Sequence, residues 1–225
     1  LLADRAVFYE GIGENAKAIA DLGALLKIEP DVDTYLWRAR LRPDRDFAEA
    51  MVDIAAARAL KPTSQEALEQ LVALRVRRNE FELASKEIDD AIVLGLDRAV
   101  LLPLRASIEE EAGKLDTALA TLQSAVDLTA GNAEVLNALC WMKATHKRSL
   151  DTALRDCSKA VERWDDPSPA LDSRGVVYLQ LGRYDDAISD FDAAIKLNPD
   201  LGPTFFVRGI AKRRKGDIEA GDSDI

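Results

Sequence analysis

Small and large apolar residues recur along this chain at helical spacing and again at a longer, nearly fixed interval. In the stretch GRYDDAISDFDAAIKLNPD (182–200), Ala187, Phe191 and Ala194 are four and three residues apart, so they share one face of a helix. Similar triplets, each opening on an alanine, begin at residues 18, 50, 84, 118, 153 and 187, with steps of 32 to 35 residues. We interpret this regularity as a structural unit that is repeated along the chain.

A second pattern lies upstream of each triplet. A large apolar residue is followed four positions later by a small or modest one, and this pair recurs every 33 to 35 residues. The pairs are Leu2/Ala6, Tyr35/Ala39, Leu68/Val72, Leu102/Ala106, Leu136/Cys140, Leu171/Gly175 and Phe205/Gly209. Each unit therefore predicts two helices, the first carrying the pair and the second carrying the triplet.

Turn-forming residues separate the predicted helices. The residues between the first and second helices are Gly13, Asn79, Gly113, Gly182 and Gly216, which suit the left-handed conformation that closes a helix. Pro30, Pro62 and Pro199 stand near the ends of second helices, where the missing N–H prevents the helix from continuing.

A helix–turn–helix unit of about 34 residues resembles the tetratricopeptide repeat. The resemblance is strongest in residues 168–200, at Leu171, Gly175, Tyr178, Ala187, Phe191, Ala194 and Pro199. It implies an all-α fold, a right-handed superhelical solenoid of antiparallel helix pairs. We expect a single solenoid over residues 1–225, with repeats near 1–32, 33–64, 65–98, 99–132, 133–167, 168–201 and a truncated 202–225. Neither end reads as a polar capping repeat, so we expect a piece of a longer protein.

The chemistry-bearing residues give little basis for catalysis, a cofactor or a metal. His146 is the one histidine and lies in a basic turn, so no histidine-based metal cluster or proton relay can be built. The stretch GIGENA (11–16) falls on a turn between helices, and the acidic pairs at 89–90, 165–166 and 185–186 are interpreted as solvated helix or linker positions. We therefore expect that the chain is not an enzyme.

The two cysteines both belong to the fifth repeat. Cys140 occupies the small site of the first helix and Cys157 the large site of the second. In the geometry that the resemblance implies, the two side chains face each other, with Cα atoms within roughly 8 Å. Because the repeat pattern accounts for both residues, we favour reduced thiols in the core; the alternative is a disulfide or a redox sensor.

Charge and hydropathy bear on the partners. The net charge of −10 argues against a nucleic-acid partner, and no run approaches the roughly 20 apolar residues of a membrane span. The basic run KRRK (212–215) is the local exception; capping of a helix end is favoured there over an anion contact.

The resemblance also implies that first helices line the concave side of the solenoid. We expect a partner-binding groove from residues on their free faces: Asn137, Trp141, Asp172, Val176, Leu179, Phe206, Ile210 and Arg213. The alternative is that Trp141 and Phe206 are buried between neighbouring helix pairs. The third and fourth repeats carry a more polar, acidic wall. No lysine–asparagine set accompanies Asn137, which disfavours the carboxylate clamp of chaperone-binding members of the family.

These observations predict a protein–protein interaction scaffold that binds a peptide or helix of a partner. The alternative is an accessory repeat segment of a larger bacterial enzyme or secretion-type envelope assembly, packed against a neighbouring domain. The sequence leaves the partner unnamed, and the compartment is open between bacterial cytoplasm and periplasm.

Overall fold

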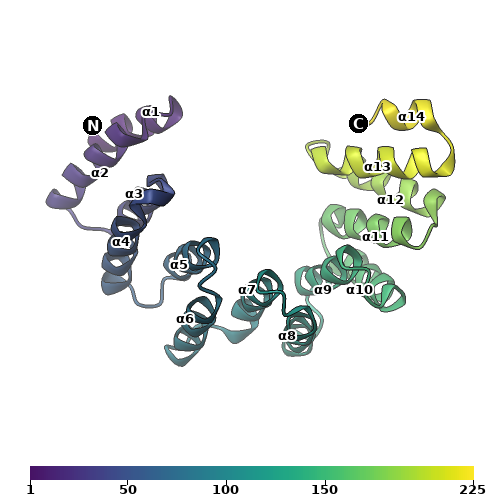
Figure 1. Ribbon diagram of the computed structural model, residues 1–225, viewed down its shortest axis with the longest axis horizontal. Helices are drawn as coiled ribbons and strands as arrows, with labels where there is room; N and C mark the ends of the chain where they lie inside the picture. The colour runs from purple at the N-terminus through teal and green to yellow at the C-terminus, as the bar shows by residue number, and fades with distance from the viewer. The chain divides into compact units, whose positions relative to one another are not determined.

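The computed structural model describes residues 1–225 as fourteen α-helices and one short 3-10 helix, without a β-strand (Figure 1). The elements are α1 (Leu2–Gly11), α2 (Asn15–Ile28), α3 (Val32–Leu41), η1 (Asp44–Asp46), α4 (Phe47–Leu60), α5 (Gln65–Arg77), α6 (Phe81–Val93), α7 (Arg98–Glu111), α8 (Leu115–Leu128), α9 (Ala133–Thr145), α10 (Leu150–Arg163), α11 (Ser168–Gln180), α12 (Tyr184–Leu197), α13 (Gly202–Lys215) and α14 (Ile218–Asp222). The predicted all-α class is confirmed.

The helices form two compact units, which we call the N-terminal half (Leu1–Lys114) and the C-terminal half (Leu115–Ile225). In the N-terminal half α1 packs on α2, α3 on α4 and α5 on α6. In the C-terminal half α9 packs on α10, α11 on α12 and α13 on α14. Each repeat inferred from the sequence contributes two helices, and the expectation of a single solenoid over residues 1–225 stays a prediction.

The triplets of the second helices form the core. The alanines that open them, Ala18, Ala50, Ala84, Ala118, Ala153 and Ala187, are all buried. The large residue in the middle of each triplet is buried as well, and Phe191 is among the largest side chains that are completely enclosed. The interpretation of these positions as the inner face of the second helices is confirmed.

The second position of each first-helix pair holds a small residue where the partner helix lies close to it. A Cβ atom on Gly175 would come within 2.5 Å of the ring of Phe191. A Cβ atom on Gly209 would come within 2.7 Å of the carbonyl oxygen of Gly221. Both distances are too short for a side chain, so glycine lets the two helices of each pair approach.

The turns follow the sequence pattern. All five predicted turn residues have positive φ, from 58° at Asn79 to 111° at Gly216. The second repeat is a residue or two shorter than the others around Arg42 and Pro43. There the short helix η1 follows Pro43 and joins α3 to α4. The fifth repeat is one residue longer within residues 144–151, and Lys147 and Ser149 in this stretch take positive φ. These two departures from the repeat pattern are thus confined to loops.

A third repeated feature escaped the sequence analysis. In four repeats an arginine three residues after the large site donates through two guanidinium nitrogens to an aspartate of the second helix. These pairs are Arg5–Asp21, Arg38–Asp53, Arg174–Asp190 and Arg208–Asp224. The side chains of these aspartates are at most about a tenth exposed. The recurrence of arginine at positions 5, 38, 174 and 208 can be read from the sequence. Only the structure shows which aspartate each arginine pairs with.

The last of these pairs predicts a dependence of stability on pH. The hydrogen bond from Arg208 lowers the pKa of Asp224 to about 2, and a second hydrogen bond from Lys212 acts in the same direction. The folded-state pKa lies below the unfolded value of about 3.9, so ionised Asp224 stabilises the fold above about pH 4, and this contribution is lost as the pH falls towards 2. Thermal unfolding of Asp224→Asn between pH 2 and 6 should therefore show a shallower loss of stability than the unmodified chain.

The exposed Asp192, which accepts from the same arginine, provides the control. Asp192→Asn should keep the steep fall in melting temperature between pH 4 and 2. Equal slopes for Asp224→Asn and the unmodified chain would show that the Arg208 pair does not set this dependence.

Candidate functional site

The first helices of the last three repeats, α9, α11 and α13, lie next to one another in the C-terminal half. Helix α11 contacts both α9 and α13 (Figure 1). Trp141 of α9 is 44% exposed and Phe206 of α13 is 51% exposed. The alternative that these two aromatic residues are buried between helix pairs is therefore wrong.

The aliphatic residues of the predicted groove are placed differently. Val176 and Leu179 are only 8% and 7% exposed. They lie in a hydrophobic cluster with the buried Ala211 of α13, against which Ile210 also packs. The expectation of exposed apolar surface is thus wrong for Val176 and Leu179, because the sequence pattern did not reveal how far α13 covers α11.

Two polar residues of the predicted groove carry unpaired atoms. Asn137 of α9 and Asp172 of α11 are half-buried, and the Oδ1 atom of each is buried without a hydrogen-bond partner. Burial raises the pKa of Asp172, and a hydrogen bond with Thr204 of α13 opposes that rise. Each residue directly follows the large site of its repeat, so the two acceptors occupy equivalent positions on adjacent helices.

The basic run at the end of α13 is engaged within its own half. Lys212 pairs with Asp224 at 2.8 Å, Arg213 with Asp222 at 3.0 Å, and Lys215 with Asp185 at 2.8 Å. Three of the four cations are therefore largely neutralised by carboxylates of the chain. Arg213, the member assigned to the groove, remains half-exposed.

A disulfide joins Cys140 of α9 to Cys157 of α10, with the Cα atoms 5.4 Å apart. The predicted facing geometry and separation are confirmed. The interpretation as two reduced thiols is wrong. Both cysteines are completely buried, and the bond ties together the helix pair that carries the exposed Trp141.

The remaining candidate positions are turns and surface. The stretch 11–16 runs from the end of α1 to the start of α2, and the turn between them includes Gly13 with φ of 76°. His146 is exposed at the end of α9. No cluster of three or more His, Cys, Asp or Glu side chains is arranged to hold a metal ion. No helix has the length and apolar character needed to cross a membrane.

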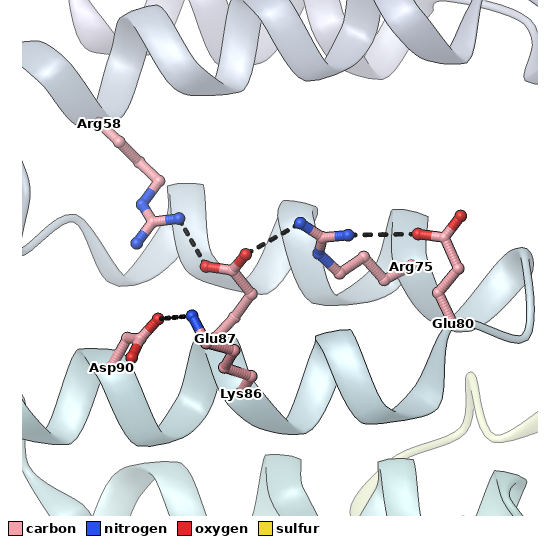
Figure 2. Close-up of polar contacts among 6 residues, drawn as sticks. All are labelled: Arg58, Arg75, Glu80, Lys86, Glu87 and Asp90. Atoms are coloured by element: carbon pink, nitrogen blue, oxygen red, sulfur yellow. Dashed lines mark hydrogen bonds and ion pairs between the residues drawn. The ribbon is translucent and has the colours of Figure 1, made fainter.

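The N-terminal half contains a charged network that the sequence analysis also missed. Figure 2 shows Glu87 of α6 between two arginines, Arg58 of α4 and Arg75 of α5, at 2.7 and 3.0 Å. Arg75 also donates to Glu80 at 3.2 Å. The network therefore links the second helix of repeat 2 to both helices of repeat 3. These residues lie outside the apolar pattern, so periodicity could not reveal them.

Consecutive helix pairs at a period near 34 residues define the class of helical-repeat proteins. Within that class, residues 173–201 match the model of the tetratricopeptide repeat family. This stretch is a tetratricopeptide repeat, and the helix pairs in the rest of the chain share its helical-repeat architecture, as the sequence analysis predicted.

Individual comparisons extend the likeness to the whole chain. The chain is 24% identical over 238 residues to DnaJ homolog subfamily C member 3 of Gallus gallus, covering 93% of this chain and 46% of that protein. It thus spans about half the length of this curated relative.

Two solved structures share the fold. One is a tetratricopeptide repeat protein of Parabacteroides merdae, with a TM-score of 0.69 and 14% identity over 99% of this chain and 89% of the other. The second is YrrB, described as a TPR protein with an unusual peptide-binding site, with a TM-score of 0.53 and 20% identity over 83% of this chain and 97% of the other. At these identities the likeness is one of fold.

Proposed function

We propose that this chain is a non-catalytic protein-interaction scaffold that binds an extended or helical segment of a partner protein through α9, α11 and α13. The match of residues 173–201 to the tetratricopeptide repeat model supports the scaffold, and the peptide-binding site ascribed to YrrB is a precedent on a similar fold. A protein partner is favoured over nucleic acid because the chain has a net charge of −10.

The exposure of Trp141 and Phe206 carries this proposal. Aromatic side chains that stay about half exposed on a structured helix leave apolar surface in water, and such surface marks a partner site when it is contiguous. Tryptophan is also the residue type most enriched among interface hot spots. The disulfide at the adjacent Cys140 restrains the backbone of the helix pair that carries Trp141, so less backbone freedom is lost there when a partner binds.

The unpaired oxygens of Asn137 and Asp172 support the same surface. A buried acceptor without a donor is unfavourable by about 1–3 kcal/mol. Small movements of either side chain on binding would bring it to a backbone N–H of the partner segment. We propose that Val176 and Leu179 form the packed base of the site, with Ile210 and Arg213 at its edge.

Replacing Trp141 with Ala is expected to weaken partner binding by about 2 kcal/mol or more. The reason is that, without the indole ring of a hot-spot residue, the pocket that it fills on the partner stays empty. The partner is first captured on the immobilised unmodified chain and identified by mass spectrometry. Its affinity for both chains is then measured by isothermal titration calorimetry.

Leu128→Ala provides the control. Leu128 is a half-exposed apolar residue on α8, the second helix of its repeat, so this substitution should leave the affinity unchanged. A partner that binds equally well to the double variant Trp141→Ser, Phe206→Ser would place the site elsewhere on the chain and overturn the assignment.

A second candidate function is a repeat segment that packs against a neighbouring domain, and Phe8 favours it. Phe8 is 60% exposed on α1, whereas every equivalent residue in the later repeats is buried. These equivalents are Leu41, Leu74, Ile108, Met142, Val177 and Ala211. A photo-crosslinker at position 8 tests this function; labelling no greater than from exposed Val52 of α4 would exclude it.

A further inference from the structure

Arginines are concentrated in one part of an otherwise acidic chain. Residues 38–47 and 75–80 contain seven arginines and three acidic residues, whereas the whole chain has 30 basic and 40 acidic residues. The first segment covers the end of α3, η1 and the start of α4, and the second covers the end of α5 and the following turn. Both segments lie in the N-terminal half.

The carboxylates near these arginines are shared. Asp53 accepts from both Arg38 and Arg42. Glu87 accepts from Arg58 and Arg75, and Glu80 from Arg75 and Arg78 (Figure 2 draws Arg58, Arg75, Glu80 and Glu87). Five guanidinium groups therefore depend on three carboxylates, and the Nε atom of Arg75 is buried with no acceptor at all. The region keeps an excess of positive charge after its internal pairs are made.

Three adjoining clefts open beside these arginines. A cleft of about 400 Å³ between α3 and α5 is lined by Arg40 and Arg77, together with Ala39, Gln70, Ala73, Leu74 and Val76. A second cleft, of about 170 Å³, shares Leu74 and Arg77 with the first and is also lined by Arg42, Asp44, Phe47 and Arg78. A third, of about 410 Å³, includes Arg40, Arg42 and Arg45 together with the acidic Glu14 and Asp46. We call this surface the arginine cleft.

The arginines at the mouth of the cleft are held loosely. Arg40 and Arg77 are 60% and 59% exposed, and their nearest carboxylates are 3.5 and 3.6 Å away, on Glu10 and Asp44. Exposed ion pairs of this length contribute little, so a better acceptor can displace them. Arg78 is stacked over the ring of Phe47 at 4.3 Å, which places an apolar surface beside the charges.

We infer that the arginine cleft binds an acidic segment of a partner protein, with carboxylates between Arg40 and Arg77 and an apolar side chain against Phe47 and Leu74. Guanidinium groups form paired hydrogen bonds with carboxylates. A short acidic segment needs only the local positive charge, whereas a long nucleic acid would also meet the negative charge of the remaining surface. This surface is separate in residues from the Trp141 site, and only the protein nature of its ligand rests on the proposed scaffold function.

The test is fluorescence anisotropy with a fluorescein-labelled ten-residue peptide of alternating Glu and Leu, titrated with the unmodified chain and with Arg40→Gln, Arg77→Gln. The double variant should bind about tenfold or more weakly, because two charge-assisted contacts are lost. The same peptide with Gln in place of Glu should bind as weakly to the unmodified chain. Binding of the acidic peptide should also weaken as salt is raised.

Two further measurements make the test decisive. The matched control Arg98→Gln, Arg155→Gln removes two exposed arginines from outside the cleft and should change the affinity less than about twofold. Trp141→Ala should leave binding of this probe intact, which separates failure of this inference from failure of the proposed function.

Equal binding of the Glu and Gln peptides, or an unchanged affinity in the cleft variant, would overturn the inference. So would tighter, cleft-dependent binding of a ten-nucleotide single-stranded DNA.

Discussion

A Phe191→Ala variant is expected to have a free energy of unfolding about 3–5 kcal/mol below that of the unmodified chain. Phe191 is fully buried at the centre of the α12 triplet, and its ring lies against Gly175 of α11. Truncation removes the ring from the core and leaves a cavity that the rigid helix pair cannot fill. Urea unfolding followed by circular dichroism at 222 nm measures the change.

The contact with Gly175 provides an internal check. Gly175→Ala places a Cβ atom where the ring now lies, 2.5 Å away, so alone it should destabilise by about 1–3 kcal/mol. In the Phe191→Ala background the same substitution should be much less costly, because the cavity accepts the methyl group. Leu197→Ala on the exposed side of α12 is the control and should change stability by about 0.5 kcal/mol or less. Additive effects of the two core substitutions would refute this helix–helix contact.

Reduction of the Cys140–Cys157 disulfide is expected to lower the free energy of unfolding by about 3 kcal/mol. The bond closes a loop between residues that are 17 apart in the sequence. In the chain-entropy account, closing a loop of this size lowers the entropy of the unfolded chain and so stabilises the fold by about that amount. Because the bond is buried between α9 and α10, the loss should begin in the repeat that carries Trp141. Urea unfolding with and without dithiothreitol measures it.

A chain with both cysteines changed to Ala is the control, since its stability should not respond to dithiothreitol. Thiol titration in denaturant gives an independent readout. No free thiol before reduction and two after it are expected; two titratable thiols in the unreduced chain would refute the disulfide.

The sequence by itself determined the fold. Apolar positions at helical spacing decide which face of each helix is buried, and their return near every 34 residues decides that the same helix pair is built again. Even the contact distance between helices was implied, because Gly175 and Gly209 stand where a larger residue stands in other repeats. Such features depend on residues close in sequence, so one chain read by itself is enough to predict them.

The candidate sites were decided by contacts that the repeat pattern does not encode. Trp141 and Val176 occupy equivalent positions, yet one is exposed and the other buried, because burial depends on how closely the next helix pair packs. The cysteines fitted the pattern as small apolar residues, and only their 5.4 Å Cα separation showed a bonded pair. The arginine cleft depends on which carboxylate each long side chain reaches, and those partners come from different helices. Periodicity records the burial of apolar faces, whereas surface charge, exposure and cross-helix pairing are settled only when the helices are placed in space.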